Sequence, residues 1–216
     1  MNLREAIRAG ERDAVHHLIR YEWAARCLAD WPVRSLLDLA TGSGYGAHEL
    51  AVRLPATRIT GVDYDAGAIE EARARYVLPN LEYRTGDATC WAATIGPKAF
   101  DAIVSFDMIE HVVHREIMME GLVRHLAPGG TLLLSTPCGH LETVLKPVWV
   151  HHRIEYSLAS LYDFLRRYFA VVVQPDDREF PHRDAFDLLA EGSVTYFLKM
   201  NPVLCREPIV IENPYQ

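Results

Sequence analysis

Residues 36–46 read Leu36-Leu37-Asp38-Leu39-Ala40-Thr41-Gly42-Ser43-Gly44-Tyr45-Gly46. An apolar run typical of a buried strand passes through an acidic residue into glycines, and a helix-length segment follows. Glycine lets the backbone turn sharply and approach a ligand closely, and the first N–H groups of a helix are free to bind a polar group. The stretch therefore predicts a strand, a nucleotide-binding loop and a helix, with an adenosine-bearing cofactor as the natural ligand.

This loop by itself is compatible with two cofactors. Gly42, Gly44 and Ala47 match the G-x-G-x-x-G/A spacing of dinucleotide-binding proteins. Asp38 stands before the glycines, where its carboxylate can meet a cationic amino group. Asp63 follows the next strand and can accept both ribose hydroxyls, a role that nicotinamide and S-adenosylmethionine enzymes share. These residues leave the choice between the two cofactors open.

Three later segments narrow that choice. They are Arg84-Thr85-Gly86-Asp87-Ala88, residues 100–112 and residues 126–137. Their order after residues 36–46 resembles the ordered motifs of the class I S-adenosylmethionine-dependent methyltransferases, over about residues 15–200. The resemblance implies an α/β fold of the Rossmann-like kind, with a doubly wound, seven-stranded, mainly parallel sheet and an antiparallel hairpin at its edge.

The composition favours one globular enzyme domain over residues 1–216, with an N-terminal helical segment at residues 1–30. Hydrophobic residues make up 50% of the chain and charged residues 24%, so the chain can bury a core. The formal net charge is −7, which gives no electrostatic footprint for a phosphate backbone. Nucleic acid is therefore disfavoured as a partner, and a small-molecule acceptor is expected.

The cysteines and the apolar runs predict where in the cell the protein is found. The four cysteines form no C-x-x-C pair and no secretory framework, which predicts reduced thiols and a cytoplasmic protein. No apolar run reaches the roughly 18 residues of a membrane span, and the first residues lack a hydrophobic signal core. No membrane partner is expected. The sequence is compatible with a homo-oligomer but does not set the oligomeric state.

Short apolar runs alternate with helix-length segments along the chain, the pattern of a mainly parallel sheet covered on both faces. Strands are expected near residues 35–40, 58–62, 80–84, 101–105, 130–135, 169–173 and 193–198. Helices are expected near residues 13–29, 45–54, 65–76, 112–126 and 158–168. Pro128-Gly129-Gly130 predicts a turn before the fifth strand, and the proline-containing tail from Asn201 is expected to pack irregularly over the surface.

Parallel α/β sheets bind ligands beyond the carboxyl ends of their strands, where every motif above lies. The family resemblance would put Asp38 and the glycine loop around the methionine moiety of the cofactor, Asp63 on the ribose, and Asp87 with Ala88 beside the adenine. Arg20-Tyr21 resembles a pair near the cofactor carboxylate in some small methyltransferases, although a surface arginine beside a core tyrosine explains it equally well. The expected cofactor-binding residues are Arg20, Tyr21, Asp38, Ala40, Gly42, Gly44, Asp63, Tyr64, Asp87, Ala88, Ser105 and Phe106.

Asp107, Glu110 and His111 follow the fourth strand and are expected to open the next helix, facing the methyl group of the cofactor. Acids in a first helical turn also complement the helix dipole. A histidine there can act as a general base that takes the proton of an attacking hydroxyl. The expected catalytic residues are His111, His152 and Glu110, with either histidine as the base.

Residues 137–157 are too long for a plain turn and are expected to form a lid on the substrate side. This segment holds His140, Glu142, His151, His152 and Glu155. Ile109-Glu110-His111, Ser135-Thr136-Pro137 and residues 152–156 resemble the metal-dependent small-RNA 2′-O-methyltransferases, whose analogy would make Asp107, Glu110, His111 and His152 ligands of a divalent metal. That family has glutamate where this chain has Asp107. A similar segment also occurs in small methyltransferases of sugar and natural-product pathways, where the histidines would serve as base or surface residues.

The donor set of two carboxylates and two imidazoles suits Zn²⁺, Mn²⁺ or Fe²⁺ better than Mg²⁺. The function that follows is transfer of a methyl group from S-adenosyl-L-methionine to a hydroxyl of a small metabolite or sugar-like acceptor. Three alternatives remain open: a metal-dependent RNA 2′-O-methyltransferase, an NAD(P)-dependent oxidoreductase, and a non-catalytic partner with the methyltransferase fold.

Overall fold

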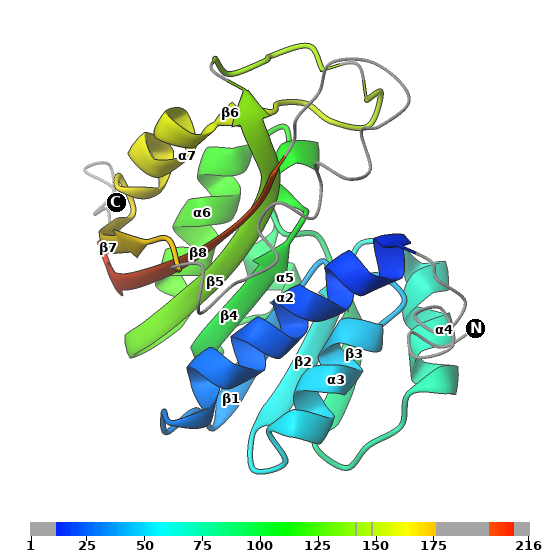
Figure 1. The fold of residues 1–216 in the computed structure, drawn as a ribbon. Coiled ribbons are helices and arrows are strands. Elements are labelled where there is room, and N and C mark those ends of the chain that lie inside the picture. Colours follow the sequence, from blue (N-terminus) through cyan, green and yellow to red (C-terminus); the bar gives the residue numbers. More distant parts are fainter. Residues whose placement is uncertain (1–11, 141, 148, 176–198, 210–216) are drawn as a thin grey trace.

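The strand that begins at Ser35 forms the middle of one sheet in the computed structural model, which describes residues 12–140, 142–147, 149–175 and 199–209 (Figure 1). β1 (Ser35–Leu39) pairs in parallel with β2 (Arg58–Asp63) on one side and β4 (Phe100–Phe106) on the other. β3 (Leu81–Thr85) extends the sheet beyond β2, and β5 (Leu126–His140) extends it beyond β4. The strand order thus reverses between β1 and β4, the switch point at which such sheets bind ligands.

The edge of the sheet beyond β5 is antiparallel. β8 (Lys199–Pro208) lies between β5 and β7 (Phe169–Val173) and runs antiparallel to both. The full order is β3-β2-β1-β4-β5-β8-β7, and the two-residue β6 (Tyr156–Ser157) pairs with the end of β5. The predicted mainly parallel sheet with an antiparallel pair at its edge is confirmed, while β6 and β8 lie outside the seven ranges predicted for strands.

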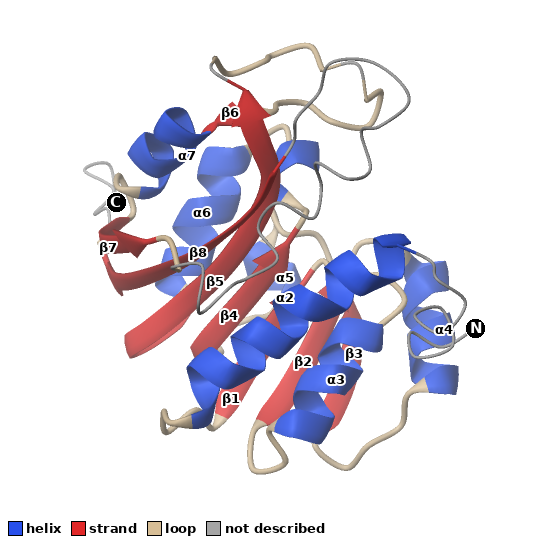
Figure 2. Ribbon diagram, viewed as in Figure 1, coloured by secondary structure: helices blue, strands red, loops and turns tan. Residues whose placement is uncertain are grey.

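Helices cover both faces of this sheet (Figure 2). α2 (Arg12–Ala29), α3 (Tyr45–Arg53) and α4 (Ala66–Arg75) cover one face. α5 (Trp91–Thr94), α6 (Arg115–Arg124) and α7 (Leu158–Leu165) cover the other. Because side chains of a strand alternate between faces, neighbouring residues of one strand enter different cores. The first core takes Leu36, Ala102 and Leu133, and the second takes Leu37, Ile103 and Leu132.

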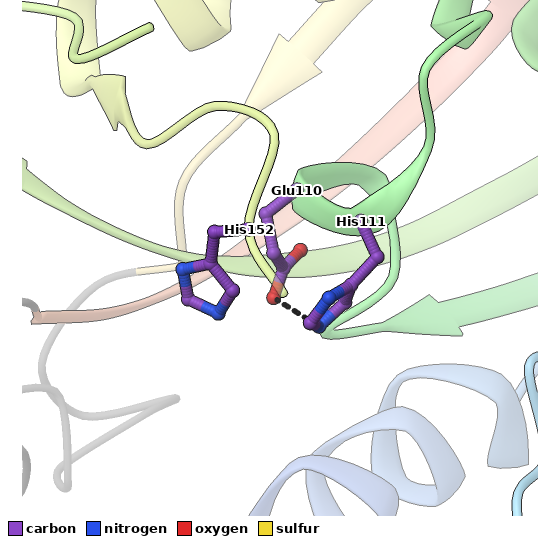
Figure 3. Close-up of side chains that lie close together, drawn as sticks. All are labelled: Glu110, His111 and His152. Carbon is purple, nitrogen blue, oxygen red and sulfur yellow. Dashed lines mark ion pairs between the residues drawn. The ribbon is translucent and has the colours of Figure 1, made fainter. Parts of the chain in front are cut away.

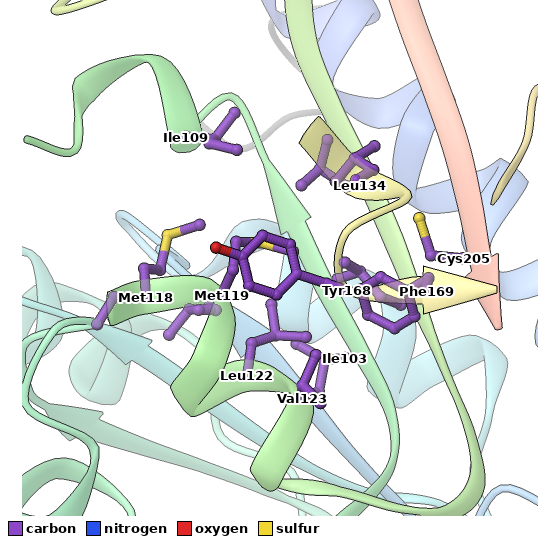
Figure 4. Packing of buried hydrophobic residues seen from close by; sticks show 14 of the residues in the cluster. Ile103, Ile109, Met118, Met119, Leu122, Val123, Leu134, Tyr168, Phe169 and Cys205 are labelled. Atoms are coloured by element: carbon purple, nitrogen blue, oxygen red, sulfur yellow. The ribbon is translucent and has the colours of Figure 1, made fainter. Parts of the chain in front are cut away.

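The second core shows why α6 lies where it does. Its buried face carries Met118, Met119 and Leu122, which are 0% exposed and lie close to Ile103 and other residues of the same cluster (Figure 4). Burial of a side chain of this size contributes about 1.5–3 kcal/mol. The apolar face of α6 therefore fixes the helix against β4, and with it the turn that joins the two.

Residues 201–208 of the tail correct one prediction, since they form part of β8 and are not irregular. Val203 and Cys205 are 0% exposed, because β8 lies inside the sheet and is covered on both faces. Pro202 pairs with Ser135 of β5, beyond the point at which β7 ends its pairing with β8 at Leu204. Proline is tolerated where a neighbouring strand is absent, so its presence misled the prediction. The strand expected at residues 193–198 lies outside the described residues.

Two further boundaries differ from expectation. Phe100 pairs with Leu126 and Ala102 with Thr131, so residues 127–130 form a bulge inside β5, with Gly129 at a φ of 77°, where a turn before the strand was predicted. The helix expected from residue 112 begins at Arg115, after a short 3₁₀ turn η1 (Ile109–His111). The second difference shapes the site described below.

The contact between α2 and α3 depends on Gly46. A Cβ at this position would lie 1.9 Å from Cζ of the buried Tyr21, whose hydroxyl is bonded to Asp38 and cannot move aside freely. We expect Gly46→Ala to lower the free energy of unfolding by about 1–3 kcal/mol. Urea denaturation followed by circular dichroism measures this change. The matched control, Val52→Ala on the exposed side of α3, should change it by less than about 0.5 kcal/mol. Equal effects of the two substitutions would contradict this account of the helix contact.

Candidate functional site

A cleft of about 730 Å³ opens at the carboxyl ends of β1 to β4. Its walls come from the loops after these strands and from the segment that precedes β6. Of the predicted cofactor residues, it is lined by Ala40, Asp63, Tyr64, Asp87 and Ala88. It is also lined by Leu39, Val62, Gly86, Thr89, Asp107, Met108, His111, Val112, Val113, His114, His151 and Arg153. A second hollow of about 460 Å³, at the opposite ends of the strands, is lined by none of the predicted site residues.

Asp63 ties the glycine loop to the end of β2. Its Oδ2 accepts a hydrogen bond from the Gly42 N–H (2.8 Å), and its Oδ1 accepts one from the Asp65 N–H (3.0 Å). Asp65 in turn caps α4 by accepting from Gly67 and Ala68. The carboxylate is therefore fixed at the cleft wall, and each oxygen keeps a lone pair for a ligand hydroxyl.

The far wall of the cleft, after β3, carries Asp87 and Ala88. Asp87 Oδ1 accepts hydrogen bonds from the N–H and the hydroxyl of Thr89, both at 2.7 Å, which lower the pKa of its carboxyl. Tyr64 stands between this wall and Asp63, with 82% of its surface exposed. An exposed aromatic ring beside a carboxylate provides a flat apolar surface for a base.

Asp38, which was predicted to meet the methionine moiety, is screened from the cleft. Its side chain is 0% exposed and accepts hydrogen bonds from Tyr21 Oη (3.2 and 3.3 Å) and from Thr41 Oγ1 (2.6 Å). Burial raises the pKa of Asp38 to about 7, although these hydrogen bonds oppose the shift. Asp38 thus stabilises the start of the glycine loop from behind.

Several other predicted cofactor residues also lie outside the cleft lining. Gly42 and Gly44 turn the loop with φ values of 55° and 82°, and the Gly44 carbonyl accepts from the Tyr83 hydroxyl. Ser105 is 0% exposed, and Phe106 packs against Tyr21 with ring centroids 5.1 Å apart. These residues support the loop and the end of β4.

Arg20 pairs with Asp107, the first residue after β4. Arg20 is 1% exposed, and its Nη1 lies 2.5 Å from Asp107 Oδ2. His17 Nδ1 lies 2.6 Å from Arg20 Nη2 and 3.8 Å from Asp107 Oδ2. Asp107 Oδ1 accepts from Ser135 Oγ at 3.3 Å. Of this group, Asp107 lines the cleft, and the arginine lies behind it.

The backbone at Asp107 keeps this residue out of any helix. Asp107 has a φ of 51°, and its N–H donates to the Ser135 carbonyl at 2.9 Å. A left-handed residue cannot be part of a right-handed helix. The η1 turn follows and ends at Val112, whose extended backbone (φ −87°, ψ 127°) separates it from α6 at Arg115. Asp107 therefore does not open the next helix, contrary to the prediction.

Glu110, His111 and His152 come together beside the cleft (Figure 3). Each offers one ligand atom, and these atoms lie within 4.8 Å of one another. Glu110 is 0% exposed; its Oε2 accepts from Thr136 Oγ1 (2.8 Å), and its Oε1 has no hydrogen-bond partner among the described residues. His111 Nε2 lies 3.9 Å from that oxygen, and the two imidazole centroids are 4.9 Å apart. The structure does not bring Asp107, the fourth predicted metal ligand, into this group.

Neighbouring acceptors set the proton positions on the two histidines. His111 Nδ1 lies 3.0 Å from the His151 carbonyl, and His152 Nδ1 lies 2.7 Å from Oε1 of the buried Glu155. A carbonyl and a carboxylate can only accept, so each Nδ1 carries the proton and each Nε2 keeps its lone pair. The sequence contained Glu155 but gave it no role, although its spacing of three residues from His152 was a signal for this contact.

Burial sets the protonation of this group. It raises the pKa of Glu110 to about 8, with the nearby charge of Asp107 acting in the same direction. Burial also lowers the pKa of His111. A neutral imidazole near neutral pH can act as a base or as a metal ligand. The unpartnered Glu110 Oε1 and two Nε2 lone pairs also fit a divalent cation that accepts nitrogen and oxygen ligands, such as Zn²⁺, Mn²⁺ or Fe²⁺.

The predicted lid is fastened to this group through the main chain. The Glu110 carbonyl accepts from the N–H groups of Arg153 (2.6 Å) and Ile154 (3.4 Å), and Glu155 forms an antiparallel bridge with Val144. His151 lines the cleft, and Glu142 is exposed. The side chain of His140 lies outside the described residues. The position of the lid segment therefore depends on the position of Glu110.

The burial of Asp38 predicts a pH-dependent stability. Its pKa rises from 3.8 to about 7 in the folded chain, so between these values the folded chain holds a proton that the unfolded chain releases. The stability of the wild type should therefore fall relative to Asp38→Asn as the pH rises from about 4 to about 7, by at most about 1.4 kcal/mol per pH unit. Urea denaturation of both proteins at several pH values measures the difference. If the free energies of unfolding of the two proteins changed equally with pH, the raised pKa of Asp38 would be contradicted.

Comparisons with known proteins agree with this architecture. A family model described as "Methyltransferase domain" matches residues 36–130. A trans-aconitate 2-methyltransferase of Delftia acidovorans is 31% identical over 170 residues, 77% of this chain and 60% of that protein. A ubiquinone biosynthesis O-methyltransferase of Alkalilimnicola ehrlichii is 30% identical over 131 residues, 59% of this chain and 52% of that protein. The chain spans about half the length of the curated relatives it matches.

A solved structure supports the fold. The N-methyltransferase NodS from Bradyrhizobium japonicum superposes with a TM-score of 0.61 at 16% identity, over 92% of this chain and 98% of that one. Among the described residues, the helices are too short or too polar to cross a membrane. The glycine spacing alone was compatible with a nicotinamide cofactor. The motif order, the family model and the relatives all favour S-adenosylmethionine instead. The family model and the relatives assign residues 36–130 of the chain to the S-adenosylmethionine-dependent methyltransferases.

Proposed function

We propose that this chain transfers the methyl group of S-adenosyl-L-methionine to an oxygen atom of a small acceptor. The observation that carries the proposal is the position of Glu110, His111 and His152. Glu110 and His111 follow β4, His152 belongs to the predicted lid, and His111 lines the same cleft as Asp63 and Asp87, the residues predicted to bind the cofactor. A neutral imidazole beside a methyl donor suits a hydroxyl nucleophile, which must lose a proton as it attacks.

The relatives support an oxygen acceptor of small size. One acts in ubiquinone biosynthesis as an O-methyltransferase, and another is a trans-aconitate 2-methyltransferase. The net charge of −7 favours a small acceptor over the RNA alternative, because an acidic chain repels a phosphate backbone. The cytoplasmic location stays a prediction from the sequence.

The chemistry needs little from the protein beyond alignment and proton removal. The sulfonium is already a good leaving group, so the cleft has to hold the acceptor oxygen, the methyl carbon and the sulfur in line. As the carbon–oxygen bond forms and the carbon–sulfur bond breaks, the hydroxyl proton passes to a neutral Nε2 of His111 or His152. Glu155 on the Nδ1 atom of His152 stabilises the imidazolium that results if His152 takes the proton.

Replacing His111 should separate catalysis from cofactor binding. We expect His111→Ala to lower kcat about 100-fold or more, because general bases contribute about 10²–10⁴-fold, while the Kd for S-adenosylmethionine changes little. Release of S-adenosylhomocysteine over a screen of hydroxyl-bearing acceptors gives kcat, and calorimetry gives Kd. His114→Ala is the matched control, since His114 lines the same cleft outside the group. Equal losses of kcat and affinity would indicate a structural role, and cofactor binding without transfer to any acceptor would favour the non-catalytic alternative.

We also propose that Glu110, His111 and His152 can hold a divalent cation. When bound, such an ion would act as a Lewis acid that lowers the pKa of the acceptor hydroxyl. Titration of the metal-free chain with Mn²⁺ or Zn²⁺ by calorimetry should show one site per chain. His152→Ala should weaken that site at least tenfold, and His114→Ala should leave it unchanged. A wild type that binds neither ion at this site would contradict the metal proposal and leave the histidines as bases.

A further inference from the structure

We infer that Asp107 binds the α-ammonium group at the amino-acid end of S-adenosylmethionine, and that Arg20 is the positioning residue that holds the Asp107 carboxylate. The inference rests on the proposed use of this cofactor. It assigns one charged group of the cofactor to one side chain of this chain. It also transfers to Asp107 the role that the position of Asp38 before the glycine loop had suggested.

The order of the strands sets the direction in which the cofactor lies. S-adenosylmethionine is a linear molecule whose adenine, ribose, sulfonium and amino-acid end follow one another. With the adenine beside Asp87 after β3 and the ribose on Asp63 after β2, the molecule continues past Ala40 after β1 toward β4, since the strands are neighbours in the order β3-β2-β1-β4. Asp107 is the acid that the cleft presents after β4.

The other acids near the cleft are already used or turned away. Asp38 is 0% exposed behind Tyr21 and Thr41. Asp63 lies at the ribose position, and Asp87 lies on the far wall. Glu110 is buried and is not among the described residues that line the cleft. An ammonium group that leaves water needs an anionic partner, and the position of Asp107 provides one.

The contacts of Asp107 hold its carboxylate in one place before a ligand arrives. Arg20 Nη1 binds Oδ2 at 2.5 Å, Ser135 Oγ donates to Oδ1, and the left-handed backbone is held by the bond from the Asp107 N–H to the Ser135 carbonyl. Arg20 is 1% exposed and the Asp107 side chain is 17% exposed, so the carboxylate faces the cleft with its counter-charge behind it. A carboxylate fixed in this way binds without a further loss of side-chain freedom.

Two compounds related to the cofactor allow a direct test without knowledge of the acceptor. S-adenosylhomocysteine carries the amino-acid end, and 5′-methylthioadenosine lacks it. Calorimetry of the wild type should show tighter binding of S-adenosylhomocysteine. Asp107→Asn should raise the Kd for S-adenosylhomocysteine about tenfold or more, the range of a hydrogen bond between charged groups. The Kd for 5′-methylthioadenosine should stay unchanged, which also shows that the variant is folded.

Asp63→Asn is the matched control, because the ribose is present in both ligands and both should bind more weakly. If Asp107→Asn leaves the Kd for S-adenosylhomocysteine unchanged or lowers it, Asp107 does not hold the ammonium group and the inference fails. Equal weakening of both ligands by Asp107→Asn would show a structural effect and would also overturn it. A wild type that binds both ligands equally well refutes the inference alone, whereas a wild type that binds neither refutes the proposed cofactor use as well.

Discussion

The left-handed backbone at Asp107 is the constraint on which the rest of the site depends. A residue with a φ of 51° follows directly after β4 and lies outside any helix. The single η1 turn that follows buries the Glu110 side chain and leaves His111 at the cleft. The Glu110 carbonyl then receives Arg153 and Ile154, which fixes the lid. Main-chain contacts thus link the residue after β4, the η1 turn and the lid segment beside the cleft.

Such a residue needs compensation, because a non-glycine residue in an uncommon backbone region costs of order 1–3 kcal/mol. The compensation comes from two strong contacts, the bond of the Asp107 N–H to β5 and the ion pair with the buried Arg20. Removal of one partner of a buried pair costs about 3–5 kcal/mol, so Arg20 and Asp107 stabilise the turn mainly by being present together. The ion pair also joins α2 to the end of β4. This explains why a helix that precedes β1 in the sequence contributes to a site after β4.

The sequence predicted the central fold well because local patterns carry it. Strands at residues 35–40, 58–62 and 80–84 and helices after the first two of them agree with β1, β2, β3, α3 and α4 within one or two residues. The differences arise from contacts that no local pattern reveals. Pro202 led to the prediction of an irregular tail, because the sequence does not show that this residue has a neighbouring strand on one side only. The position of Asp107 outside the helix is accompanied by contacts with Ser135 and Arg20, which are distant in the sequence.

The same reasoning separates the site residues that were predicted from those that were not. Ala40, Asp63 and Asp87 stand directly at strand ends, so the topology alone brings them to the cleft. The screening of Asp38 requires α2 to lie across β1, and the contact of Glu155 with His152 requires the lid to fold back on Glu110. The sheet therefore sets the wall of the cleft that carries Asp63 and Asp87, while the segment that carries His151 and Arg153 is joined to it at Glu110. Substitutions on the exposed side of that segment, for example near Trp149, which is 61% exposed, can alter the proposed acceptor surface without moving the residues that would bind the cofactor.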